Sequence, residues 1–334
     1  MIETDSPSKI LKFQASRRTV LKTATLGFVT LMFAACNKKT GEKSELKDPA
    51  KAERIRGEIR ELEEANWDNL SVETTAKLAR LIPELYQATF GRKSIENQFF
   101  FVDNSFFTSQ GLPGEEAPLG HAGFIKFYDE TQVDDPSTIP IIILVGKPEI
   151  KDPNLNKLSV VRGLLIHEYI HAQTVPVVEN GEIIVGGERF RALYRRGLKW
   201  EYLNGNEEEG KGRFFEEINT QLLSEYLNDP TEKDQLFNQI VQNPVYRFSL
   251  APNYVAGAAI LAKIYQKLGI TPEEIEGFHF KAQPKEFLEK IDKLIQKQGI
   301  KLEKPASLIL LNLNPPNPQT EEGLEPLKEL ASKI

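Results

Sequence analysis

Two segments early in the chain have hydrophobic residues at a helical period. The charged segment 51–66 carries apolar residues at helical spacing between polar ones, and it predicts a solvated helix. Ser71 is a typical N-cap residue, and a run rich in leucine follows it. We therefore expect a second helix that runs to Phe90 and ends near Gly91.

Further along, the pattern changes from strands to helices. Three short apolar runs have the β-branched and aromatic character of strands: Gln98–Val102, Gly123–Tyr128 and Ile139–Val145. Longer segments with a helical pattern follow: Leu158–Gln173, Gly186–Leu203, Phe214–Leu227 and Tyr254–Leu268. After about Thr271 the pattern weakens into a charged helix and a proline-rich tail. This order predicts an α+β fold, in which a small mixed or antiparallel sheet packs on a helix and a mainly helical subdomain follows.

Composition narrows the classes of partner. The chain has 334 residues, of which 40% are hydrophobic and 27% are charged, as in an ordinary soluble globular protein. Its formal net charge is -6. Binding to DNA or RNA requires a basic surface, and the sequence offers none. We therefore expect no nucleic-acid partner.

The amino-terminal residues have the pattern of an export signal. Arg17 and Arg18 stand before an uncharged stretch, Thr23–Ala35, which is shorter than the roughly 20 residues of a membrane-spanning helix. This arrangement resembles the twin-arginine signal. Small residues before Cys36, the single cysteine, resemble the lipobox of bacterial lipoproteins. That resemblance implies a lipid on Cys36 that anchors an extracytoplasmic protein to a membrane; an unmodified cysteine after a plain secretory signal is the alternative. Residues 37–50 then predict a flexible tether.

The strongest chemical signal is His167-Glu168-Tyr169-Ile170-His171. Histidines four positions apart lie one helical turn apart on the same face, so their imidazoles can hold one metal ion. Glu168 is placed to act as a general base on water. The flanking residues are apolar and predict a buried helix. A core helix with two hydrogen-bonded histidines is the alternative.

This motif resembles the His-Glu-x-x-His helix of zinc metallopeptidases, whose zinc ion takes three protein ligands. The residues after His171 lack the glycine and third histidine of metzincins, which excludes that class. Residues 214–226 resemble the Glu-x-x-Thr-[Glu/Gln] helix of the gluzincin type. That resemblance implies Glu217 as the third zinc ligand and Thr220 as a support for a zinc-bound histidine. Glu216 is the rival ligand.

A weaker resemblance concerns Tyr254-Val255-Ala256-Gly257. Related peptidases have Tyr-x-x-Gly at the start of a helix after the ligand glutamate. The resemblance implies that the hydroxyl of Tyr254 stabilises an oxyanion. An ordinary buried tyrosine is the alternative, and His121 and His279 are further candidate donors.

The resemblance, which covers about residues 95–268, implies a zincin-like fold. The expected organisation is as follows: a signal peptide at 1–35, a tether and charged helix at 36–66, a metallopeptidase domain at 67–270, and a C-terminal helix and tail at 271–334.

The implied activity is zinc-dependent hydrolysis of a peptide or protein substrate, with Glu168 as general base. We expect Ile139–Val145 to be an edge strand that pairs with extended peptide. One alternative is a catalytically inactive lipoprotein of the same fold with a binding or structural role. Another is a metal hydrolase that acts on a different substrate, because fold and metal do not fix the substrate.

Overall fold

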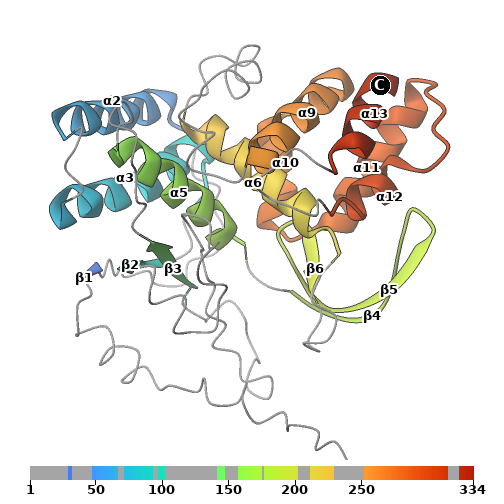
Figure 1. Ribbon diagram of the computed structural model, residues 1–334, viewed down its shortest axis with the longest axis horizontal. Coiled ribbons are helices and arrows are strands. Elements are labelled where there is room, and N and C mark those ends of the chain that lie inside the picture. Colours follow the sequence, from blue (N-terminus) through green and yellow to red (C-terminus); the bar gives the residue numbers. More distant parts are fainter. Residues whose placement is uncertain are drawn as a thin grey trace, which may run out of the picture.

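Helices make up most of the part of the chain that is described by the computed structural model (Figure 1). That part comprises residues 29–31, 47–66, 71–92, 97–102, 141–146, 157–174, 177–201, 211–228, 252–314 and 323–334. Two small sheets accompany the helices, so the fold is of the α+β type with helices dominant. Within the described residues, no helix combines the length and the apolar character that crossing a bilayer requires.

The first two helices form a pair. They are α2 (Pro49–Ala65) and α3 (Val72–Phe90), and they pack against each other. The predicted start and end of α3 are confirmed, because the Ser71 side chain caps the helix and Gly91 ends it with a φ of 68°. The helix α2 was expected to be solvated. It instead buries one face, including Ile55 and Ile59, in the common hydrophobic core.

A mixed sheet lies beside α5 (Lys157–Ala172). Its strands, in spatial order, are β1 (Val29–Leu31), β2 (Asn97–Val102) and β3 (Ile141–Gly146). The strand β1 pairs antiparallel with β2, and β3 pairs parallel with β2. Among the described strands β3 is therefore at an edge, as expected. The predicted strand Gly123–Tyr128 lies outside the described residues.

The prediction of a helix at Gly186–Leu203 is wrong. That region belongs to a second, antiparallel sheet of three strands: β4 (Val177–Val185), β5 (Glu188–Arg196) and β6 (Lys199–Glu201). Gly186 and Gly187 have φ of 57° and 89°, which is the left-handed pair that a two-residue hairpin turn needs. Ile184 is exposed while the residue on each side of it is buried, so the period is that of a strand.

Three central helices carry most of the core. The predicted helices here are confirmed to within two residues at each end, as α5, α6 (Arg213–Asn228) and α9 (Pro252–Leu268). The helix α6 contacts both α5 and α9 and lies between the two halves of the helical layer in Figure 1. Gly257 permits the close crossing of α9 and α6, since a Cβ there would lie 2.7 Å from Cγ2 of Ile218.

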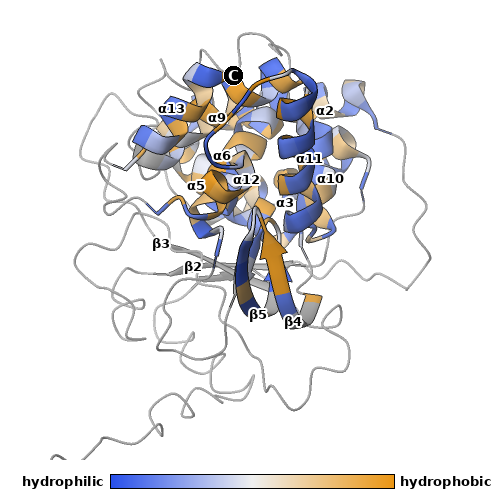
Figure 2. Cartoon of the chain, turned by 90° about the vertical axis from the view of Figure 1, so that its right-hand side faces the viewer, coloured by the Kyte–Doolittle hydropathy of each residue, from blue (hydrophilic) through white to orange (hydrophobic). Residues whose placement is uncertain are grey.

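The C-terminal region is more ordered than its sequence pattern suggested. Its described residues form four helices: α10 (Pro272–Phe280), α11 (Pro284–Lys297), α12 (Ala306–Leu311) and α13 (Glu325–Lys333). The prolines of the predicted tail, at 315–318, lie outside the described residues. The first begins with a capping box, in which Thr271 and Glu274 satisfy each other's backbone N–H groups. In Figure 2 the outer face of α11 is hydrophilic, while Phe287 and Ile291 lie in the core. These helices thus join the core of the preceding residues.

The crossing of α9 and α6 predicts opposite effects for two glycine-to-alanine changes. Gly257→Ala inserts a methyl group against a β-branched side chain and should lower the free energy of unfolding by about 1–3 kcal/mol. Gly57→Ala, inside α2 with open space around it, should raise it by about 0.5–1 kcal/mol. Urea unfolding of both variants tests this. Equal effects would mean that Gly257 does not set the crossing.

Candidate metal centre

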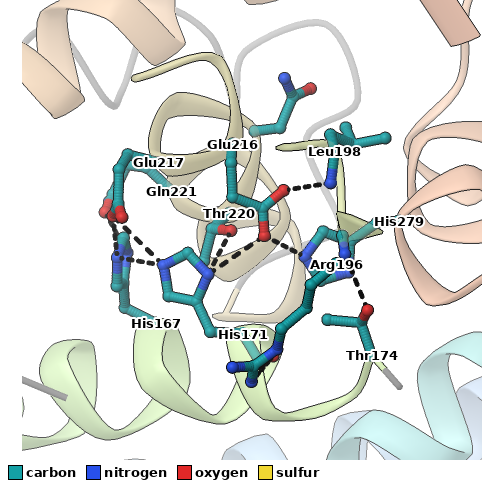
Figure 3. Close-up of polar contacts among 12 residues, drawn as sticks. His167, His171, Thr174, Arg196, Leu198, Glu216, Glu217, Thr220, Gln221 and His279 are labelled. Carbon is teal, nitrogen blue, oxygen red and sulfur yellow. Dashed lines mark hydrogen bonds and ion pairs between the residues drawn. The ribbon is translucent and has the colours of Figure 1, made fainter. Parts of the chain in front are cut away.

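Two buried helices bring three ligand atoms together. Nε2 of His167 and Nε2 of His171, both on α5, lie 3.2 Å apart. Oε2 of Glu217, on α6, is 3.2 Å from each of them. Figure 3 shows the carboxylate of Glu217 facing both imidazoles. The sequence-predicted trio therefore forms one compact group in the structure.

The spacing of these atoms fits a metal ion. Zinc lies about 2.0–2.1 Å from nitrogen and oxygen ligands, so two ligands at tetrahedral corners are about 3.3 Å apart. The three observed separations of 3.2 Å match that value. The three residues would supply three of the four ligands that zinc takes in tetrahedral coordination. Two imidazoles and one carboxylate are also a donor set that zinc accepts.

The α5 helix presents both imidazoles because it is buried on nearly all sides. Its apolar residues pack into the core around its whole circumference, including Leu164, Leu165 and Ile166. The side chains of His167 and His171 project from one face toward α6 and are themselves almost fully buried. Buried polar groups require partners, so the second nitrogen of each ring decides how the ring is held.

The second nitrogen of His167 contacts an amide. Nδ1 of His167 lies 3.2 Å from Oε1 of Gln221, and the amide nitrogen of Gln221 donates to Glu225 at 2.6 Å. The bond to Glu225 fixes the orientation of the amide, whose oxygen then accepts from Nδ1–H. Burial raises the pKa of Glu225 to about 8, against the opposing effects of Gln221 and Arg162. The tautomer of His167 thus leaves the Nε2 lone pair free for a metal.

The second nitrogen of His171 contacts a carboxylate and a hydroxyl. Nδ1 of His171 is 3.2 Å from Oε1 of Glu216 and 3.2 Å from Oγ1 of Thr220. Thr220 therefore lies where the resemblance placed it, beside a histidine of the trio. Glu216, the rival ligand, faces the outer nitrogen of His171 and lies away from the three converging atoms (Figure 3).

The carboxylate of Glu216 is buried, with 1% of the residue exposed, and it has three hydrogen-bonding partners among the described residues. Besides His171, it accepts from Nε2 of His279 at 2.8 Å and from the backbone N–H of Leu198 at 2.6 Å. His279 on α10 was considered only as an oxyanion donor, and its contact with Glu216 was missed. The Thr271-Pro272-Glu273-Glu274 start of a helix indicates that His279 lies on a helix, but it does not indicate which residue this histidine contacts.

Opposite charges shift the pKa values of the buried groups. Burial alone would raise the pKa of Glu217, but His171 and His167 beside it hold that pKa well below its usual range. Burial is likewise outweighed at Glu216, where His279 and His171 lower the pKa. Burial lowers the pKa of His171, but Glu217 and Glu216 raise it more strongly, to about 10. Two buried carboxyl groups whose pKa values are lowered are ionised, and such a pair favours the binding of a positively charged group.

Two further predicted residues lie near the trio. Glu168 is 6% exposed and follows His167 on α5. The ring of Tyr254, at the start of α9, stacks on His167 with an interplanar angle of 1° and ring centroids 6.3 Å apart. Burial raises the pKa of Tyr254, and the Glu217 and Glu168 carboxylates raise it further against the effect of Arg213. Its hydroxyl therefore stays protonated and can donate a hydrogen bond.

The remaining predicted residues, Cys36 and His121, lie outside the described residues. Comparison with known proteins gives no match: no family model, no curated protein and no solved structure is significantly similar to this chain. The case for function therefore depends on the geometry of a buried His/His/Glu group that could hold a metal ion.

Proposed function

We propose that this chain is a zinc-dependent peptidase. The observation that carries the proposal is the convergence of Nε2 of His167, Nε2 of His171 and Oε2 of Glu217 at mutual distances of 3.2 Å. A purely structural zinc site closes all four positions with protein ligands, whereas a catalytic site has three and leaves one open. Three ligands with an adjacent glutamate favour the catalytic kind.

The chain's own residues supply the proton chemistry. When bound, zinc would acidify a water molecule and polarise the scissile carbonyl. Glu168 accepts the proton from the attacking water and returns it to the leaving amine, as a general base and then a general acid. Tyr254 keeps its proton and can donate a hydrogen bond to the oxygen on which negative charge develops.

An extended peptide is the proposed substrate. The strand β3 lies at the edge of the described sheet and contacts α5, the helix that carries both histidines. A strand at the edge of a sheet can bind extended peptide through backbone hydrogen bonds. This arrangement supports cleavage of unfolded or flexible protein segments.

The proposed location is the outer side of a membrane, with the enzyme held there by a lipid on Cys36. The support is the sequence alone: paired arginines, a short uncharged stretch and small residues before the single cysteine. A lipid anchor with a flexible tether would let the enzyme reach substrates close to the membrane surface.

Glu168→Gln should separate zinc binding from catalysis. The amide cannot take a proton, so hydrolysis of casein or a peptide should fall by roughly 10²–10⁴-fold, while zinc content is unchanged. The wild-type protein treated with a chelator should lose activity and regain it with zinc. Undiminished cleavage by the variant would remove Glu168 as the base. A wild-type protein that binds zinc and cleaves nothing would favour the inactive binding or structural role.

Glu217→Ala should remove a ligand. Zinc affinity, measured by competition with a chromophoric chelator, should fall by more than the 10–100-fold that follows loss of a ligand's hydrogen-bonding partner. A matched control is Glu273→Ala. It removes a carboxylate that accepts hydrogen bonds from Tyr226 and Lys47, neither of which belongs to the three ligand residues. The control should retain wild-type zinc affinity. Equal affinity in the two variants would exclude Glu217 as a ligand.

Cys36→Ser tests the anchor. Without the thiol no diacylglycerol can be attached, so the protein should move from the membrane fraction to the soluble extracytoplasmic fraction and lose incorporation of labelled fatty acid. Membrane retention and labelling that persist in the variant would contradict lipidation at Cys36.

A further inference from the structure

We propose that Glu216 and His279 form a buried hydrogen-bonded support that orients His171, so that helix α10 is part of the metal centre. In this role both are positioning residues. The inference rests on the metal site of the proposed function, and it adds residues from α10 that lie beyond the expected boundary of the domain at residue 270.

The carboxylate of Glu216 receives a donor at each oxygen. Oε1 accepts from His171 Nδ1 at 3.2 Å and from His279 Nε2 at 2.8 Å, and Oε2 accepts from the Leu198 N–H at 2.6 Å. A carboxylate only accepts, so each histidine must present an N–H to it. With its Nδ1 proton directed at Glu216, His171 presents to a metal its other nitrogen, Nε2, which faces His167 and Glu217. Removing the support would free both the ring orientation and the tautomer.

The turn between β5 and β6 closes the other side of Glu216. Gly197 has a φ of 56°, and a Cβ there would lie 2.3 Å from the carboxylate, so the backbone packs directly on Glu216. The N–H of Gly197 donates to Thr174 at 2.8 Å, and Arg196 donates to the carbonyl oxygen of His171 at 2.9 Å. The same turn thus holds the carboxylate and the C-terminal end of α5.

Helix α10 is anchored independently of Glu216. Glu276, three residues before His279, accepts from the Tyr86 hydroxyl at 2.7 Å and from Arg92 Nε at 2.7 Å, both contributed by α3 and its end. This second buried carboxylate fixes α10 against α3. Because that anchor does not touch Glu216, it provides a control in the same helix: its loss disturbs the docking of α10 but leaves the His279–Glu216 bond in place.

A second metal ion held by His171, Glu216 and His279 is the competing interpretation, since their ligand atoms also cluster. That ion would require Nδ1 of His171 to lose its proton while Nε2 binds the first ion. It would also displace two N–H donors that already satisfy a fully buried carboxylate. The hydrogen bonds among His171, Glu216 and His279 already satisfy these three side chains without a second ion. The geometry therefore points to a single ion, with Glu216 and His279 orienting one of its ligands.

The test compares His279→Gln with His279→Met in the full chain. The two replacements are flexible and of similar length, but only glutamine retains an N–H that can reach Glu216. Glu276→Gln is the control for docking of α10. For each protein we would measure zinc affinity by chelator competition, zinc stoichiometry, the visible absorption spectrum of the cobalt-substituted form, and the melting temperature of the metal-free form.

We expect His279→Met to lose roughly 10–100-fold in zinc affinity and to alter the cobalt spectrum. His279→Gln should retain most of the affinity, and Glu276→Gln should lower the melting temperature with zinc affinity unchanged. Should His279→Met fail to fold, Glu216→Gln provides the second test with the same expected loss. The NH2 group of the glutamine would face either the Leu198 N–H or the two histidine N–H groups, and it cannot accept from them.

Several outcomes would overturn the inference. They are wild-type affinity in His279→Met, equal losses in His279→Met and Glu276→Gln, or two zinc ions per wild-type chain. None of these depends on hydrolysis. A wild-type protein that binds one zinc ion and has no peptidase activity would contradict the proposed function and leave the inference standing.

Discussion

The burial of two imidazoles between α5 and α6 is the constraint on which the rest of the site depends. A buried ring nitrogen without a partner costs on the order of 1–3 kcal/mol. His167 and His171 together bury four such nitrogens. Two of them converge on Glu217, and the other two contact Gln221 and Glu216. The partners on α6 therefore fix both rings, and the convergence of the two Nε2 atoms on Glu217 is a consequence of that packing.

The positions 216, 217, 220 and 221 explain why α6 can serve both histidines. Residues three or four apart share a face of a helix, so Glu217 and Gln221 both face His167, while Glu216 and Thr220 both face His171. Adjacent glutamates on α6 thereby take different places in the site. Glu217 contacts the Nε2 atoms of both rings, and Glu216 contacts Nδ1 of His171. This division follows from the 100° rotation between neighbouring positions of a helix.

Local signals predicted the local features of this chain. A strong N-cap, a left-handed glycine and long apolar periods identified α3, α5, α6 and α9, and the His-x-x-x-His spacing identified the ligand face of α5. The hairpin at Gly186 was missed because its strands contain many charged residues between apolar ones. Such a mixture of charged and apolar residues is also typical of an amphipathic helix. His279 was missed because its contact with Glu216 spans 63 positions, and no short-range pattern encodes such a contact. Tertiary packing decides contacts of this kind.

The central claim is that one zinc ion is shared by His167, His171 and Glu217. Its most direct test is a crystal structure of the zinc-loaded protein, with anomalous diffraction at the zinc edge to locate the ion. We expect a single peak about 2.0–2.1 Å from both Nε2 atoms and from a carboxylate oxygen of Glu217, with an open fourth position. A peak on Glu216 and His279, or a fully loaded crystal with no peak between α5 and α6, would contradict it.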